Sequence, residues 1–419
     1  MRVLVLSRNF PNPLWPYSGI FVLDQIKALQ ALGVDAVPIA PVAWAPRALR
    51  FWPRVRKYGV IPRRDQQQGV CVEHPPILVI PHEWPLCLSG YLYYKGCREL
   101  VARRAREGGF DLIHAHRVIP DGVAAALLGR ELNIPVVCTA HGSDVNEYPE
   151  RSVTARRTTQ WALKHFQRLI TVSDRLRQRV VELGGERHVE VVYNGADSAL
   201  FQQRDRMEAR KRLQLPTNRR IIVFVGRLTR VKAIPTLLTA IRKMRSGPCH
   251  LYLVGGGELR DELVRLASEL GIADRCTFVG DQPHEKIPDW LSAADCLVLC
   301  STSEGFPAII PETMMCHTPI VATRVGGIPE IVRDGETGLL VPPSDAFSLT
   351  HAIEQMLTDE DLRERIKSRA GSIAKANFTW AANAKKTLAI YEDAVAAFVE
   401  MQNPARLPHP AAQTSSSWN

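Results

Sequence analysis

The chain has 419 residues, of which 46% are hydrophobic, and its formal net charge is +10 at pH 7. This length allows two domains with large apolar cores, while no apolar run has the roughly 18 residues of a membrane-spanning helix or the pattern of a secretory signal. The nine cysteines have neither C-x-x-C nor zinc-type spacing and suit a reducing cytosol. We therefore expect a cytoplasmic protein, and the excess positive charge favours an anionic partner.

Residues 3–39 have the pattern of a strand, a helix and a second strand. Residues 3–6 are apolar, residues 20–29 carry a helical apolar stripe that stops at Gly33, and residues 34–39 are apolar again. Because ligands of doubly wound folds bind beyond the carboxyl ends of strands, the connecting loop, residues 7–19, is a candidate binding segment. Gly19, at its end, is either close to a ligand or only a lead-in to the helix.

Residues 44–106 differ in composition, because arginines and lysines alternate with Trp, Phe and Tyr. This mixture suits a membrane interface, where aromatic rings favour the boundary and cations attract anionic lipid. The alternative is a surface insertion whose basic faces are solvated. RNA binding has no recognisable motif in support, so we expect no nucleic-acid partner.

Two further strands, residues 110–116 and 134–139, flank a helix at residues 124–128, and the first of them ends in His114-Ala115-His116. The second strand leads into T-A-H-G-S-D, which places His141 and Asp144 at the carboxyl edge of the predicted sheet. A lone histidine is more often structural, but this position favours a functional role for His141. His116 is open to both interpretations. Strands at residues 169–173 and 189–193 complete this half.

The second half begins with a charged connector, residues 200–220, and a strand at residues 221–225. This strand leads into Gly226-Arg227-Leu228, with Lys232 five residues beyond Arg227. Cations held at a strand end can stabilise negative charge that develops on a leaving group, although a solvated basic loop has the same composition. Strands at residues 250–254 and 276–279 follow, separated by Gly255-Gly256-Gly257 and a helix, residues 258–270.

The most informative stretch is S-T-S-E-G-F-P-A-I-I-P-E, residues 301–312. It follows an apolar strand, residues 294–300, and leads into a helix whose first turn tolerates Pro311. The N-terminus of this helix can bind an anion, because its N–H groups are unpaired and the helix dipole is positive there. Glu304 and Glu312 can accept hydrogen bonds from sugar hydroxyls, or can be solvated acids that the helix dipole favours.

The remaining segments complete the second half of the chain. A strand is expected at residues 319–323, followed by G-G-I-P-E at residues 326–330. Asp359-Glu360-Asp361 has the form of a D-x-D metal motif, but Thr358 and Asp361 have the spacing of a helix cap, so we predict no metal site. A helix with Leu388 and Tyr391 on one face comes last, before a Pro- and Ser-rich tail that we expect to be disordered.

These motifs together resemble the retaining glycosyltransferases of family 4. Two motifs follow each other in the family order: E-G-F-P with a second Glu eight positions after the first, and then G-G-I-P-E-I-V-x-D-G-x-T-G-L-L-V. The resemblance extends from Val3 to Tyr391. It implies an α/β GT-B fold of two Rossmann-like, doubly wound parallel-sheet domains that face each other across a cleft. The expected boundaries are an N-terminal acceptor domain (1–198), a nucleotide-sugar domain (199–376), a helix that returns to the first domain (377–402) and a disordered tail (403–419). The basic and aromatic region, about 44–106, is then an insertion in the acceptor domain that binds either the membrane or the acceptor.

The resemblance also implies the reaction and its residues. A sugar would move from a UDP- or GDP-linked donor to a glycan or lipid-linked glycan acceptor with retention of configuration, and no cofactor or metal would be required. The implied catalytic residues are His141, Arg227, Lys232 and Glu304. The implied donor-binding residues are Gly19, Gly226, Arg227, Lys232, Glu304, Gly305, Phe306, Pro307, Ala308, Ile309 and Glu312. His116 and Asp144 are expected on the acceptor side.

The sequence departs from the family pattern at two places and leaves other functions open. Ala233 replaces a usual glycine, and Pro311, Thr313 and Met314-Met315 surround Glu312 where the family has smaller or aliphatic residues. The alternatives are a nucleotide-sugar epimerase, a phosphorylase, for which we find no C-terminal cofactor-lysine motif, and a non-catalytic basic binding protein. The basic region favours polysaccharide assembly at the inner face of the membrane, with peripheral contact to anionic lipid.

Overall fold

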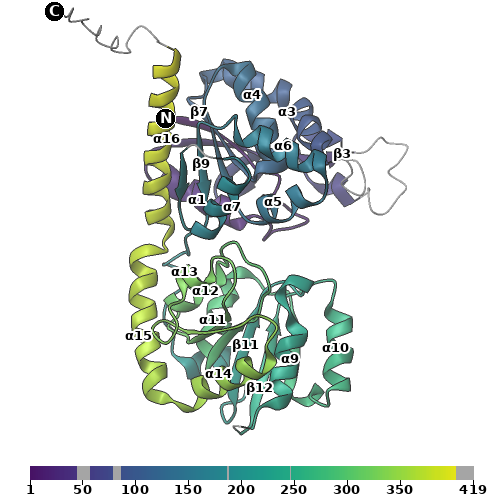
Figure 1. Ribbon diagram of the computed structural model, residues 1–419, viewed down its shortest axis with the longest axis vertical. Helices are drawn as coiled ribbons and strands as arrows, with labels where there is room; N and C mark the ends of the chain where they lie inside the picture. Colours follow the sequence, from purple (N-terminus) through teal and green to yellow (C-terminus); the bar gives the residue numbers. More distant parts are fainter. Residues whose placement is uncertain (45–56, 79–85, 186–187, 246, 403–419) are drawn as a thin grey trace, which may run out of the picture.

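The computed structural model describes residues 1–44, 57–78, 86–185, 188–245 and 247–402. Within these ranges the chain forms two Rossmann-like domains, each a large β-sheet covered by helices (Figure 1). The basic residues 47, 50, 54 and 56 and the tail, residues 403–419, lie outside the described residues. In the part that the structure describes, no helix is long and apolar enough to cross a membrane.

The sheet of the first domain has the strand order β10-β9-β8-β7-β1-β2-β5-β4. Central strand β1 pairs in parallel with both β2 and β7, so the chain direction across the sheet reverses at this point. The strands are β1 (Arg2–Leu6), β2 (Asp35–Ile39), β4 (Arg64–Gln67), β5 (Val70–Glu73), β7 (Leu112–His116), β8 (Val136–Ala140), β9 (Arg168–Thr171) and β10 (Val189–Val191). A separate pair is formed by β3 (Val42–Trp44) and β6 (Pro76–Leu78).

One edge of this sheet differs from the parallel arrangement that the sequence predicts. Strand β4 pairs antiparallel with β5, and β5 continues the sheet beside β2. The two strands are joined by Gln68 and Gly69, whose φ angles are 47° and 89°. Positive φ at both turn residues is the geometry of a tight hairpin, which requires antiparallel strands. Part of the basic region therefore forms the edge of the sheet.

Helices cover both faces of the first sheet because its central strands, β1, β7 and β8, are buried along nearly their whole length. The longest, α3, packs against α4, and the short α5 begins directly after His141 and Gly142. The helices are α1 (Ile20–Gln30), α3 (Leu86–Gly108), α4 (Val123–Leu132), α5 (Ser143–Asn146), α6 (Val153–Leu163) and α7 (Asp174–Glu182).

The second sheet is parallel throughout, with the order β13-β12-β11-β14-β15-β16. This is the strand order of dinucleotide-binding folds, in which ligands bind where the chain direction reverses, here between β11 and β14. Its strands are β11 (Arg220–Val225), β12 (Cys249–Val254), β13 (Cys276–Gly280), β14 (Cys296–Leu299), β15 (Ile320–Thr323) and β16 (Leu339–Val341). Its helices are α9 (Ile234–Lys243), α10 (Arg260–Glu269), α11 (Ile287–Ala293), α12 (Ile309–Met315), α13 (Ile328–Ile331), α14 (Ala346–Thr358) and α15 (Glu360–Asn377).

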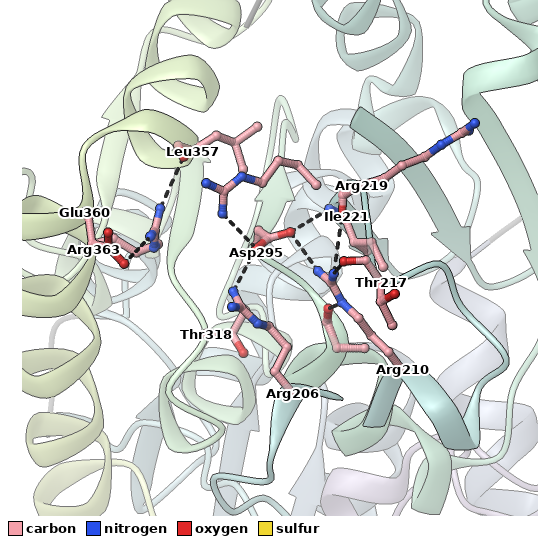
Figure 2. Close-up of polar contacts among 12 residues, drawn as sticks. Arg206, Arg210, Thr217, Arg219, Ile221, Asp295, Thr318, Leu357, Glu360 and Arg363 are labelled. Carbon is pink, nitrogen blue, oxygen red and sulfur yellow. Dashed lines mark hydrogen bonds and ion pairs between the residues drawn. The ribbon is translucent and has the colours of Figure 1, made fainter. Parts of the chain in front are cut away.

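The charged connector is a folded part of the second domain, because its helix α8 (Arg206–Arg212) is attached to Asp295 (Figure 2). The Asp295 carboxylate accepts hydrogen bonds from Arg206 at 2.9 Å, from Arg210 at 2.8 Å and from the Ile221 N–H at 2.7 Å. Arg210 and Asp295 are both buried, and a buried ion pair is tolerated only when it is hydrogen-bonded in this way.

The last helix, α16 (Trp380–Gln402), leaves the second domain and lies along the first, as Figure 1 shows. It packs against α1, and Tyr391 is fully buried in the core of the first domain. One local prediction is wrong: helix α15 is capped by Asp359, whose carboxylate accepts from the Leu362 N–H at 2.9 Å, whereas Thr358 ends the preceding helix. Asp359 satisfies the capping pattern one residue later than the sequence spacing indicates.

Candidate active site

The candidate residues lie on loops that follow the carboxyl ends of strands in both sheets. His141 and Gly142 follow β8, and Glu304 and Gly305 follow β14. The two loops are in contact, because a Cβ atom at Gly305 would lie 2.3 Å from the His141 carbonyl oxygen. Only glycine fits this approach, so the H-G-S-D and E-G-F-P segments, 160 residues apart in the chain, meet where the two domains join.

Lys232 and Glu304, predicted separately from two motifs, form an ion pair. The Lys232 Nζ lies 2.5 Å from the Glu304 Oε1, and the two side chains are 20% and 11% exposed. Ser301 donates a second hydrogen bond to the same carboxylate oxygen at 2.6 Å. The pair joins the loop after β11 to the loop after β14, the two strands between which this sheet reverses direction. The ion pair therefore places one cation and one carboxylate at the point of the sheet where a ligand is expected.

The loop after Glu304 turns into helix α12, whose N-cap is Ala308. The first helical N–H groups, near Ile309, have no acceptor within the helix, as at any helix start. The Phe306 ring is buried and stacks on Tyr193 at 5.7 Å between ring centroids. Phe306 and the buried Pro307 thus fix the direction of the loop. Ala308 and Ile309, at the end of the loop, are partly exposed, so their backbone N–H groups can bind a ligand.

Glu312 lies one turn further along α12 beside His284, a residue that the sequence did not single out. The His284 Nε2 is 3.4 Å from the Glu312 Oε1. Burial opposes protonation of His284, but the hydrogen bond and charge of Glu312 outweigh it, so the net effect is a raised pKa. Asp24 of α1 belongs to the same cluster, and burial raises its pKa to about 6. In the part of the chain that the structure describes, no group of three or more His, Cys, Asp or Glu could hold a metal ion.

The loop after β11 is shaped by close backbone contacts. A Cβ atom at Gly255 would lie 2.2 Å from the Gly226 carbonyl oxygen, which explains the glycines after β12 as packing positions. The Arg227 side chain is exposed and makes no ion pair among the described residues. Ala233 has φ 47° and ψ 39°, so the turn after Lys232 keeps the left-handed geometry that glycine adopts easily.

Three histidine rings form a row at the carboxyl ends of β7 and β8. His116 and His141 rings are stacked at 5.3 Å between centroids, with the His116 Nδ1 3.1 Å from the His141 Nε2, and His114 lies behind His116 at 4.3 Å. Burial lowers the pKa of His114 and that of His141 to about 3, and lowers the pKa of His116 well below its usual value. All three rings are therefore neutral at pH 7.

Asp144 and Gly19, two of the predicted site residues, make structural contacts. The Asp144 carboxylate is fully buried and accepts from the N–H groups of Val118 at 2.9 Å, His141 at 3.1 Å and Gly142 at 2.8 Å. Gly19 has φ 68° at the start of α1, where a Cβ atom would lie 2.0 Å from a carbonyl oxygen of the preceding loop. Asp144 thus holds the loop that carries His141.

Glu330, in the G-G-I-P-E motif, was also missed as a site residue. Its carboxylate lies in α13 and accepts from the N–H groups of Asp174 at 2.7 Å and Arg175 at 2.9 Å, at the start of α7 in the other domain. Tyr193 donates to it at 3.2 Å. The motif itself was a signal for Glu330, while Ser301 was marked only by its nearness to Glu304. Asp24 had no signal in the sequence.

Two Rossmann-like domains with the candidate side chains gathered at their strand ends define a protein of the GT-B class. Residues 18–200 match the family described as Glycosyltransferase Family 4, and residues 205–372 match Glycosyl transferases group 1. The chain therefore belongs to the family 4 glycosyltransferases.

Curated relatives support this assignment. A Bacillus subtilis (strain 168) protein whose proposed role is that of a teichuronic acid biosynthesis glycosyltransferase, TuaC, is 30% identical over 92% of this chain and 96% of its own. The D-inositol 3-phosphate glycosyltransferase of Mycobacterium bovis (strain BCG / Pasteur 1173P2) is 34% identical over 69% of this chain and 62% of its own.

Solved structures share the fold at lower identity. Sucrose-phosphate synthase from Thermosynechococcus elongatus has a TM-score of 0.78 at 24% identity, over 95% of this chain and all of that one. A structure of Anabaena HepE in complex with UDP and glucose has a TM-score of 0.73 at 22% identity, over 94% of this chain and all of that one. Both are similar over almost the whole length of this chain, so the GT-B prediction is confirmed.

Proposed function

We propose that this glycosyltransferase moves a sugar from a nucleoside diphosphate sugar to a glycan or lipid-linked glycan acceptor, with retention of anomeric configuration. The observation that carries the proposal is the Lys232–Glu304 pair, with 2.5 Å between Nζ and Oε1. It puts a cation for a diphosphate and an acceptor for a sugar hydroxyl side by side, which is the pairing of groups that a nucleotide sugar presents. HepE, which shares the fold, was solved with UDP and glucose.

The donor lies along the second domain in this proposal. Arg227, Lys232 and the N–H groups at the start of α12 stabilise the charge that develops on the leaving diphosphate. Glu304 holds a sugar hydroxyl, Glu312 accepts from the ribose hydroxyls, and His141 contacts the far side of the sugar. The hydrogen bond from His284 to Glu312 supports this role, because it keeps the carboxylate oriented. No enzyme nucleophile is invoked, since a two-carboxylate plan requires both acids beside the scissile bond.

The acceptor lies along the first domain, and its class follows from the relatives and the surface. TuaC is named for teichuronic acid biosynthesis. The described part of the basic region exposes Trp44, Leu78 and Tyr91, and the Lys95 ammonium lies 5.5 Å from the Tyr91 ring centroid. Exposed aromatic and cationic groups together favour peripheral contact with the cytoplasmic face of an anionic membrane. Co-sedimentation with anionic vesicles at increasing salt measures this contact.

Transfer by the purified protein, with UDP-, GDP- and ADP-sugars and candidate acceptors, tests the proposal. We expect one nucleotide sugar to be consumed only when an acceptor is present and the product to keep the anomeric configuration of the donor, as read by NMR. Glu304→Gln and Lys232→Met should each reduce kcat by about 100- to 1,000-fold, the usual effect of losing one preorganised polar contact in an active site.

A matched control is available on α15, where Lys367 and Glu364 form an ion pair of 2.8 Å far from the site. Glu364→Gln should leave transfer unchanged, and all variants should unfold at similar denaturant concentrations. Consumption of the donor without an acceptor would indicate an epimerase. A folded Glu304→Gln protein with nearly full activity would contradict the site assignment, and binding of a nucleotide without any turnover would indicate a binding protein.

A further inference from the structure

The row of histidines contains enough contacts to determine where its protons lie. At its inner end, the Tyr391 hydroxyl lies 2.6 Å from the His114 Nδ1, and the His114 Nε2 lies 2.8 Å from the Thr139 Oγ1. Tyr391 is fully buried, and its hydroxyl is hydrogen-bonded to His114. A buried hydroxyl proton must be donated, so Tyr391 donates to Nδ1 and the single proton of neutral His114 is on Nε2, where it is donated to Thr139.

His116 is the next ring, and one of its nitrogens has no partner. Its Nδ1 forms the 3.1 Å hydrogen bond with the His141 Nε2, whereas its Nε2 is buried and unpaired. A neutral imidazole carries its proton on one nitrogen only. A proton on Nε2 would be a buried donor without an acceptor, which is rarer in proteins than an unpaired acceptor. The proton of His116 is therefore on Nδ1, and His116 donates to His141.

This hydrogen bond decides the state of His141. If the His141 Nε2 accepts, the proton of neutral His141 must be on Nδ1. That nitrogen makes no hydrogen bond among the described residues and is not one of their buried unpaired atoms, so it faces accessible space. The ring is held in place by His116 on one side and by Phe21 at 4.6 Å between ring centroids on the other.

We propose that His116 is a positioning residue that fixes His141 as the Nδ1–H tautomer, so that His141 presents a hydrogen-bond donor to an oxygen atom of the transferred sugar. His116 itself is 2% exposed. The sequence placed His116 on the acceptor side, whereas in this proposal it acts through its contact with His141. The role of His141 at the sugar rests on the proposed function. The tautomer does not, because it follows from contacts within the first domain.

Nitrogen-15 NMR of histidine-labelled protein measures the tautomer directly. In the wild type we expect a protonated, pyrrole-type shift for the His141 Nδ1 and an unprotonated, pyridine-type shift for its Nε2, with the signals assigned by difference against His141→Gln. His116→Phe keeps the stacked ring but removes the donor, so His141 should become a mixture of tautomers. Its kcat should fall by about tenfold, the effect of one lost hydrogen bond.

Two variants separate positioning from mere packing. His116→Asn carries an amide N–H near the place of Nδ1–H and should restore both the tautomer and most of kcat. Tyr391→Phe removes the buried hydrogen bond to His114 but leaves the His116–His141 bond intact. It should lower stability without changing the tautomer or kcat. Nucleotide affinity should be the same in all variants, because the nucleotide is expected to bind to the second domain.

The outcomes distinguish this inference from the proposed function. An Nε2–H tautomer in wild-type His141, or an unchanged tautomer and kcat in His116→Phe, would overturn the inference, and the wild-type spectrum decides the first point even if the variant fails to fold. Full transfer activity in His141→Gln would instead remove His141 from the reaction and leave the tautomer assignment intact.

Discussion

Ala233 illustrates what a single residue contributes near the site. It has φ 47° between Lys232 and helix α9, in the left-handed region that costs a residue with a Cβ atom about 1–2 kcal/mol. The sequence identified Ala233 as a departure from the family's glycine, but the sign of φ is not encoded in the residue type. The structure shows that alanine adopts this left-handed turn directly after Lys232, at the expense of local strain.

Ala233→Gly should therefore stabilise the protein. Relief of the left-handed strain contributes about 1–2 kcal/mol, and the greater freedom of glycine in the unfolded chain offsets about 0.4–1 kcal/mol of it. The expected net gain is between about 0 and 1.6 kcal/mol in the free energy of unfolding, measured by urea denaturation. Gln214, an exposed residue with φ 55° after helix α8, offers the control Gln214→Gly, which should give a similar gain away from the site. A loss of stability in Ala233→Gly alone would refute the strain argument.

At the scale of elements, the strands and helices that carry the site were predictable within a few residues. Residues 221–225 were expected as a strand and β11 is Arg220–Val225, because a run of apolar residues bounded by glycine leaves few alternatives. The antiparallel β4–β5 hairpin was not predicted, since the residues of β4 are polar and both strands were assigned to a basic insertion. The cap of α15 was displaced by one residue, as cap positions often are.

Glu330 could not have been assigned to α7 from the sequence, because the two are 155 residues apart and belong to different domains. The unpaired N–H groups at a helix start usually find an acceptor nearby in the chain. Here the Ser173 side chain caps α7 from within the first domain, accepting from Leu176 at 3.3 Å, and Glu330 adds two acceptor oxygens from the second. In Figure 1, α13 lies at the end of the second domain that faces the first. The two domains are thus hydrogen-bonded through a helix cap.

We expect Glu330→Ala to loosen the contact between the domains. Loss of the cap should lower the free energy of unfolding by about 1 kcal/mol. It should also raise the radius of gyration in small-angle X-ray scattering, because nothing then links α13 to the N–H groups of α7. Ser173→Ala removes the other cap of the same helix and should lower stability by a similar amount without changing the scattering. Equal scattering curves for the two variants would show that Glu330 does not hold the domains together.

In the whole molecule, charged side chains of both domains form one cluster that neither domain contains alone. Asp24 of α1 faces His284 and Glu312 of the second domain, Asp197 of the crossing segment, and Lys27 of its own helix. Composition and motif reasoning placed each residue in its element, but the cluster exists only once the two domains are assembled. That is why the sequence placed candidate residues on both domains and missed the charged groups that connect them.

The Asp24 cluster predicts how stability depends on pH. Burial, with Asp197 and Glu312, raises the pKa of Asp24 in the folded protein from 3.8 to about 6, although His284 and Lys27 oppose the shift. The folded state therefore holds this proton more tightly than the unfolded state. The contribution of Asp24 to stability is greatest below pH 3.8 and is lost progressively as the pH rises to about 6, above which the ionised carboxylate destabilises the fold.

Asp24→Asn isolates this contribution because the amide has nearly the same shape and no charge. The variant should resemble the wild type near pH 4 and become more stable than the wild type as the pH rises through about 6, in urea denaturation curves recorded at each pH. Asp35→Asn, whose side chain is 65% exposed, controls for the loss of a surface carboxylate. A stability difference that is constant across this range would mean that Asp24 is solvated, and hence that the domains stand further apart in solution than the Asp24–His284 cluster requires.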